Sequence, residues 1–198
     1  MIPDRQPHLP LPSYTVPLTG ENVSEKRQQI LEYFLHSWEL YESLFECLDS
    51  ADAWTTKAIS LRHPLIFYYA HTATFYINKL MAGGYLDTRI DATIESMMAI
   101  GVDEMSWDDL DDQHYSWPTV AEERDYRVKV KSQESDFIRT MHMELPITGE
   151  TPARVILMGI EHERSQLETS SVVLLHIPIA LVKRQYRWYV CVPAPRDS

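Results

Sequence analysis

The residues best suited to chemistry lie in one segment near the C-terminus, from Gly159 to Ser171. Within it, His162 and Gln166 are four residues apart, so on a helix their side chains project from the same face, one turn apart. Two histidines at this spacing would form half of a site for a divalent transition metal. Glutamine takes the second position here, and its amide oxygen is a weaker donor than imidazole. The segment therefore predicts a metal-site helix in which one ligand is changed.

A further candidate ligand is His71, which belongs to the strongly apolar segment 64–75. On a helix His71 lies one turn from Phe67 and from Phe75, so we expect it to point into the protein core. A buried imidazole needs a partner, because an unpartnered buried polar group costs about 1–3 kcal/mol. Facing helices in a bundle can supply metal ligands to a shared core site. His71 and His162 are thus candidate ligands from two different helices.

Each of these residues also has a purely structural interpretation. A single histidine on an apolar helix face is more often a hydrogen-bonded core residue than a ligand, and any two polar residues fit a spacing of four. Gln166 can donate a hydrogen bond to His71 or His162 and satisfy them without a metal. Glu168 is interpreted by spacing alone as a solvated or ion-paired helix residue. Residue types and spacing leave the metal site and the polar core cluster both open.

Helices must position these residues, and the hydrophobic pattern predicts four of them because apolar residues recur every three or four positions. Two starts resemble capping boxes, at Asn22 with Glu25 and at Thr119 with Glu122, and Pro152 suits a first helical position. No segment shows convincing strand alternation, so the sequence predicts an all-α four-helix bundle. The first predicted helix begins at Asn22 or Ser24 and carries an apolar stripe that reaches Leu48. The other three run from about His63 to Met81, from Thr119 to about Met143, and from Thr151 to about His176.

A long connection, residues 84–118, separates the second predicted helix from the third and would let the two run parallel. Connections of this length are often functional, and this one is acidic and carries Trp107 and Trp117. It is a poor calcium loop, because the glycine and the closing glutamate of such loops are absent at the required offsets. We expect a solvated connection with short helical turns. Its acidic residues are Asp103, Glu104, Asp108, Asp109, Asp111 and Asp112.

The 198 residues are enough for one domain with a sizeable core. Prolines crowd residues 1–21, which we expect to form an extended N-terminal arm, followed by the bundle at 22–182 and an aromatic C-terminal tail at 183–198. Exposed aromatic residues in the tail, Trp188 and Tyr189, would suit packing on the bundle or on a partner.

Charge and hydropathy narrow the possible partners. A formal net charge of −11 disfavours nucleic-acid binding, which needs basic patches, and no apolar run approaches the roughly 20 residues that span a bilayer. The first residues do not resemble a signal peptide. Cys47 and Cys191 are far apart in the sequence and match no metal or redox motif, so we expect two reduced thiols and a cytoplasmic protein.

Three separated blocks, residues 61–75, 101–110 and 157–171, resemble one known family. From about Arg27 to Val182 the sequence is similar to the N-terminal DinB-like domain of 5-histidylcysteine sulfoxide synthase, the non-haem iron enzyme of ovothiol biosynthesis. The resemblance implies a DinB-like four-helix bundle and an Fe(II) site of three histidines, one from the second helix and two from an H-x-x-x-H-x-E motif on the last. The positions that match this motif set are His71, His162, Gln166 in place of the third histidine, and Glu168.

The resemblance also implies a second domain that completes the substrate pocket for histidine, cysteine and dioxygen. This sequence ends at Ser198, so we expect the missing domain on a separate chain, or a homodimer of the bundle. Two hypotheses follow: one half of an iron-dependent sulfoxide synthase weakened by Gln166, or a partner-binding or vestigial bundle with no native metal. A third, a metal-dependent thiol transferase of the wider DinB-like superfamily, is disfavoured by Gln166 for the same ligand reason.

Overall fold

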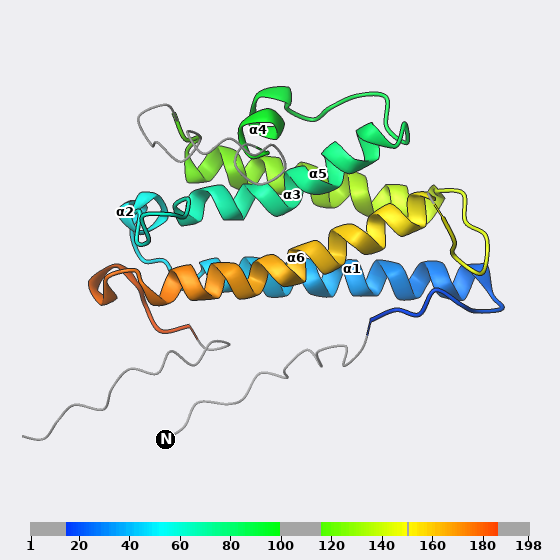
Figure 1. The fold of residues 1–198 in the computed structure, drawn as a ribbon, viewed down its shortest axis with the longest axis horizontal. Coiled ribbons are helices and arrows are strands. Elements are labelled where there is room, and N and C mark those ends of the chain that lie inside the picture. The colour runs from blue at the N-terminus through cyan, green and yellow to red at the C-terminus, as the bar shows by residue number, and fades with distance from the viewer. Residues whose placement is uncertain (1–14, 100–115, 150, 186–198) are drawn as a thin grey trace, which may run out of the picture.

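A computed structural model describes residues 15–99, 116–149 and 151–185 of the chain. The described part is all-helical apart from one isolated antiparallel bridge between Leu48 and Val182, which confirms the predicted fold class. Four long helices form the bundle (Figure 1): α1 Val23–Phe45, α3 Leu65–Ala82, α5 Val120–Thr140 and α6 Pro152–Leu175. Two short helices lie in the connections, α2 Ala51–Thr55 between α1 and α3 and α4 Ala92–Met97 between α3 and α5, and in the described part the 3-10 helix η3 Ile179–Leu181 follows α6.

The long connection allows α3 and α5 to run in the same direction, as Figure 1 shows, while α1 and α6 run in the opposite direction. Each long helix packs on two neighbours, because α1 and α3 both contact α5 and α6. At their interface, the strongly apolar helix α3 faces α6, the helix that carries His162 and Gln166.

Local chemistry sets the helix ends. The side-chain oxygen of Asn22 accepts from the backbone N–H of Glu25, and Thr119 and Glu122 form the predicted capping box at the start of α5. Helix α3 begins at Leu65 rather than His63, because a residue that precedes proline avoids the helical region. Helix α5 ends at Thr140, three residues earlier than predicted, where Met141 turns to an extended backbone with ψ 146°.

The connection between α3 and α5 contains the short helix α4, which packs on α3. A buried carboxylate, that of Glu95, fastens it: the carboxylate accepts from the backbone N–H groups of Ile90 and Asp91, both at 3.0 Å, and from the guanidinium of Arg89 at 2.7 Å. The acidic residues from Asp103 to Asp112, and Trp107 with them, lie outside the described residues.

Both flanking segments contact the bundle where they are described. In the N-terminal arm, the carbonyl of Leu18 accepts from the backbone N–H of Ile147 at 2.8 Å. At the start of the tail, the backbone N–H of Lys183 donates to the carbonyl of Cys47 at 2.8 Å. Residues 1–14 of the arm, and 186–198 of the tail with its aromatic residues and Cys191, lie outside the described part. Among the described helices, none combines the length and the apolar character needed to cross a bilayer.

Helices α3 and α6 approach each other closely at Gly159, and this limits the size of the residue that α6 can have there. A Cβ atom added at Gly159 would lie 2.4 Å from Cε1 of Tyr76 on α3. The Tyr76 ring is 1% exposed and packs edge-on against Phe34, with ring centroids 5.5 Å apart, so it has little room to retreat. Glycine at this position thus allows α3 and α6 to approach each other near His162.

We expect Gly159→Ala to lower the free energy of unfolding by about 1–3 kcal/mol, because overpacking a tight core outweighs the gain in helix propensity of about 1 kcal/mol. Urea denaturation followed by circular dichroism measures the change. Ser165→Ala, at an exposed position of the same helix, is the matched control and should change stability little. A Gly159→Ala variant as stable as the parent protein would contradict this packing.

Candidate metal centre

His71 of α3 and His162 of α6 meet at the interface of the two helices, as the sequence predicts. Their Nε2 atoms are 3.2 Å apart. His71 is 1% exposed, whereas His162 is half-buried at the edge of the interface. The pair therefore joins two helices that are distant in the sequence and places both imidazoles where one ion or one proton could lie between them.

The other ring nitrogen of His71 fixes its tautomer. Nδ1 lies 2.7 Å from the carbonyl oxygen of Met98, the residue that closes α4. A carbonyl only accepts, so Nδ1 carries the proton and Nε2 presents its lone pair to His162. An imidazole held in this way by a carbonyl is a common arrangement for a metal ligand. The connection thus orients His71 through α4 and its Glu95 anchor.

Aromatic rings enclose the two imidazoles. Phe67 stacks on His71 with centroids 5.1 Å apart, and Phe75 stacks on His162 with centroids 3.8 Å apart, both at 13° between the planes. Burial is the largest cause that lowers the pKa of His162 to about 3, and the positive charges that His71 and Lys79 can carry lower it further. His162 is therefore neutral near pH 7 and keeps a lone pair for a hydrogen bond or a metal.

Gln166 completes the group from one turn along α6. Its Nε2 lies 3.4 Å from Nε2 of His162, while its Oε1 is buried with no hydrogen-bond partner among the described residues. The two amide atoms of glutamine are interchangeable by a rotation, so either can face the histidines. The structure thus gathers all three predicted ligands, His71, His162 and Gln166.

The tautomer of His162 decides which contacts of this trio are hydrogen bonds. A neutral Nε2 of His162 has either one N–H or one lone pair, so it can serve either His71 or Gln166 at full strength but not both. If it accepts from the Gln166 amide, two imidazole lone pairs face each other at 3.2 Å. In the other tautomer His162 donates to His71, and the Gln166 amide can turn its oxygen inward, so these distances fit a hydrogen-bonded trio as well as a trio around a cation.

The spacing of the donors fits such a cation. Two nitrogens that each bind one ion at about 2.1 Å are roughly 3.0–3.4 Å apart for ligand angles between 90° and tetrahedral. The observed 3.2 Å between the Nε2 atoms lies inside this range. Over residues 15–99, 116–149 and 151–185, no three His, Cys, Asp or Glu side chains gather as a metal site; the further polar group beside the pair is the Gln166 amide.

Two glutamates that follow His162 on α6, Glu163 and Glu168, differ in their exposure to solvent. Glu168, which matches the motif glutamate, is exposed on α6. Glu163 is fully buried, and burial raises the pKa of its carboxyl while the nearby Arg127 opposes that rise. No role was predicted for Glu163 from the sequence. Its partner Arg127 lies in a charged segment of α5, where nothing in the local pattern distinguishes a buried arginine.

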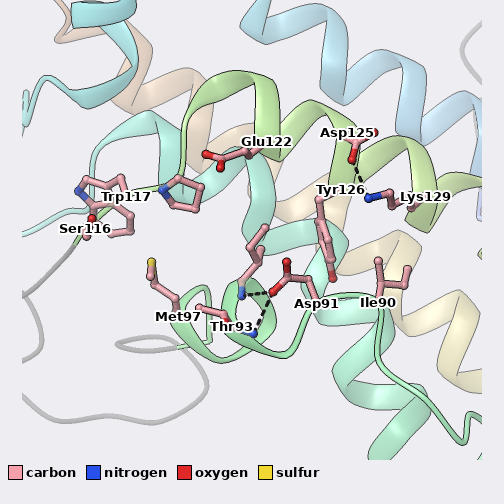
Figure 2. Close-up of a pocket in the computed structure, with 12 residues that line it drawn as sticks. Ile90, Asp91, Thr93, Met97, Ser116, Trp117, Glu122, Asp125, Tyr126 and Lys129 are labelled. Carbon is pink, nitrogen blue, oxygen red and sulfur yellow. Dashed lines mark hydrogen bonds and ion pairs between the residues drawn. The ribbon is translucent and has the colours of Figure 1, made fainter.

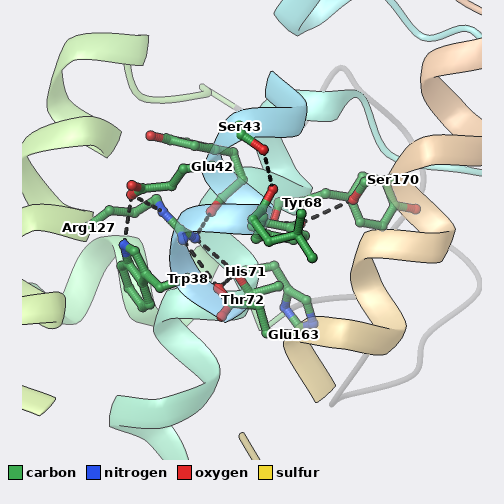
Figure 3. Close-up of polar contacts among 12 residues, drawn as sticks. Trp38, Glu42, Ser43, Tyr68, His71, Thr72, Arg127, Glu163 and Ser170 are labelled. Atoms are coloured by element: carbon green, nitrogen blue, oxygen red, sulfur yellow. Dashed lines mark hydrogen bonds and ion pairs between the residues drawn. The ribbon is translucent and has the colours of Figure 1, made fainter. Parts of the chain in front are cut away.

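Arg127 is fully buried and joins three other helices (Figure 3). Its guanidinium donates to Glu163 of α6 at 3.2 Å, to Thr72 of α3 at 2.9 Å and to Glu42 of α1 at 3.1 Å. It also lies over the ring of Trp38, 4.0 Å from the centroid. A buried charge requires partners of this kind, and two carboxylates compensate this one.

A separate hollow of about 430 Å³ lies between α4 and the start of α5 (Figure 2). Three carboxylates line it, and each already has a structural task. Asp91 caps α4, Glu122 belongs to the capping box of α5, and Asp125 pairs with Lys129 at 2.6 Å. The hollow therefore offers no free ligand set comparable with the histidine pair.

Comparison with known proteins agrees with this helical arrangement. The sequence profile of the DinB superfamily matches residues 33–170, a stretch that includes α3, α5, both histidines and Gln166. No curated protein matches the chain at a significant level.

Proposed function

We propose, from the premise that this chain belongs to the DinB superfamily, that it is a divalent-metal-binding member of the family in which His71, His162 and Gln166 hold the ion. The observation that carries the proposal is the pair of Nε2 atoms at 3.2 Å, with the His71 lone pair directed at His162 by the Met98 carbonyl. Two neutral imidazoles and one amide oxygen form a set of neutral donors, so the bound ion keeps its full charge.

Iron(II) is the metal we propose, because three sequence blocks resemble the iron-dependent 5-histidylcysteine sulfoxide synthase. Bound there, it would supply the activation of dioxygen for oxidative C–S bond formation between histidine and cysteine. The residues of this chain would hold the ion and shield it: Phe67 and Phe75 cover the imidazoles, and the low pKa of His162 keeps its ring neutral, with one nitrogen able to bind. A second domain would complete the substrate pocket.

The test is an anaerobic titration of metal-free protein with Fe(II), repeated with Co(II) and Zn(II) as probes. We expect one ion per chain, and we expect His71→Ala and His162→Ala each to weaken binding by at least about 10–100-fold, since even the loss of a residue behind a ligand has that effect. His142→Ala is the control, because His142 is exposed and pairs only with the exposed Glu144. Equal binding by all three variants would refute the site. Dioxygen uptake on histidine plus cysteine, with the second domain present, then tests the reaction.

The alternative is a bundle that persists as a partner-binding module without a native metal. The contact of the Gln166 amide with His162 at 3.4 Å favours it, because a hydrogen bond can take the place of a ligand bond. In that case metal-free protein binds no Fe(II), and Gln166→Ala leaves partner binding intact.

A further inference from the structure

We propose that Arg127 is a positioning residue for the histidine pair, and that it holds α3 against α6 at the rotation that brings His71 and His162 together. The inference rests on the proposed metal site for its meaning. The link that Arg127 makes between Thr72 and Glu163, the residues that follow the two histidines, is observed without any metal.

The contacts of Arg127 fall on the residues adjacent to the two histidines. Thr72 follows His71 on α3, and Glu163 follows His162 on α6. The guanidinium donates to Oγ1 of Thr72 at 2.9 Å and to Oε1 of Glu163 at 3.2 Å, and the Thr72 hydroxyl donates to the same carboxylate oxygen at 3.3 Å. This polar link between α3 and α6 (Figure 3) thus involves the residue that follows each of the two histidines in the sequence.

The guanidinium itself is fixed from the other side. Its Nη1 also donates to the backbone carbonyl of Tyr69 at 2.7 Å, and its Nε donates to Glu42 at 3.1 Å. Glu42 in turn accepts from the indole N–H of Trp38 at 2.8 Å. Because a guanidinium is planar with donors in fixed directions, these partners define one orientation for it.

A directional link matters because much of this interface is apolar; another polar bridge is the Tyr41 hydroxyl, which donates to the Tyr68 carbonyl at 2.7 Å and lies 3.1 Å from the Ser170 hydroxyl. Hydrophobic contact is non-directional, so it holds α3 and α6 together without setting their rotation closely. Ligand geometry tolerates errors of only about 0.5 Å, and two ligands on separate helices depend on helix rotation. The Thr72–Arg127–Glu163 link supplies that setting next to the ligands, whereas the Met98 carbonyl fixes only the ring of His71.

The experiment compares Arg127→Met, Arg127→Lys and Thr72→Val in the full chain, with Co(II) affinity and the visible Co(II) spectrum as readouts. We expect Arg127→Met to weaken Co(II) binding by about 10-fold or more and to alter the spectrum, the size typical of residues behind a ligand. Arg127→Lys should restore part of the affinity, since it keeps the charge but not the planar fork. Thr72→Val, which preserves shape, serves where Arg127→Met does not fold.

Ile138→Ala is the matched control, because Ile138 is buried on α5 and takes no part in the Arg127 contacts. It should lower stability and leave Co(II) affinity unchanged. Folded Arg127→Met or Thr72→Val protein that binds Co(II) as tightly as the parent overturns the inference. So does Ile138→Ala if it weakens binding equally, because affinity would then follow stability alone.

A readout without metal separates this inference from the proposed function. Long-range ¹H–¹⁵N spectra report the tautomer of each imidazole, with His71 and His162 assigned by His71→Gln and His162→Gln. If the parent protein binds no metal, the proposed function fails, and Arg127 is judged on these spectra alone. In the parent we expect the spectra to show a single tautomer for each imidazole, as a fixed His71–His162 contact requires. We expect Thr72→Val to lose these signals, and identical spectra of the two proteins would overturn the inference.

Discussion

Gln166→His should raise the affinity of the protein for Fe(II) and Co(II) by at least about 10–100-fold. The glutamine amide is already 3.4 Å from Nε2 of His162, so an imidazole at position 166 starts from the same turn of α6 and faces the same point. Imidazole is a stronger donor for divalent iron than the glutamine amide oxygen. Titration of metal-free protein, with metal content measured after dialysis, gives the ratio of affinities.

The control for this substitution is Ser165→His, which adds a histidine at the exposed neighbouring position of α6. It should leave the affinity of the parent protein unchanged. Equal gains in both variants would mean that the added imidazole binds metal at the surface, and the assignment of position 166 to the site would fail. Strong iron uptake in Gln166→His alone would identify the natural site as one weakened at a single ligand.

A second large effect concerns Glu134, whose carboxyl lies fully buried on α5 with no hydrogen-bond partner among the described residues. Burial raises the pKa of this carboxyl from 4.5 to about 8. The folded protein therefore binds this proton more tightly than the unfolded chain does. Stability from this group is complete below about pH 4.5 and is lost as the pH rises toward 8, by about 1.4 kcal/mol per pH unit.

Glu134→Gln should remove this dependence, because the amide keeps the shape and never ionises. We expect the free energy of unfolding to decline less steeply between pH 5 and about 8 than in the parent, with the variant the more stable of the two at pH 8. Glu123, whose pKa burial raises to about 9, adds a decline of the same sign in both proteins. Urea denaturation at a series of pH values measures both slopes.

Glu168→Gln is the matched control, an identical change at an exposed helix position. It should follow the slope of the parent protein. If Glu134→Gln declined as steeply as the parent, the Glu134 carboxyl would have to be ionised in the folded state, and its surroundings would have to be wetter than this structure places them.

The four long helices were predictable because their determinants are local. The Thr119–Glu122 capping box and the apolar period of α3 act within a few residues, and the structure follows both closely. The pairing of His71 with His162 was also within reach, because each lies on an identifiable helix face. These features depend on spacing, which a single sequence displays directly.

Other features of the site depend on contacts between residues that are distant in the sequence, and spacing along the chain does not reveal such contacts. Arg127 belongs to a charged stretch of α5, and only the packed bundle shows that it is buried against Glu42 and Glu163. The short helix α4 differs, because its determinants are local: Asp91 caps it, and the Glu95 carboxylate accepts from backbone groups four and five residues away. The predicted end of α5 was wrong by three residues, since apolar Met141 and Met143 continue the helical pattern beyond the helix.

The hydrogen bond from His71 to the carbonyl of Met98 has a consequence for how this site can vary among related sequences. A backbone carbonyl is present whatever residue occupies position 98, so the hydrogen bond itself does not depend on the identity of that side chain, which is restricted only by its burial in the core. A further constraint falls on Glu95, whose carboxylate accepts from the backbone N–H groups of Ile90 and Asp91 at the start of the short helix that Met98 ends. Substitutions at position 95 should therefore track the presence of a histidine at position 71, although the two side chains belong to different helices.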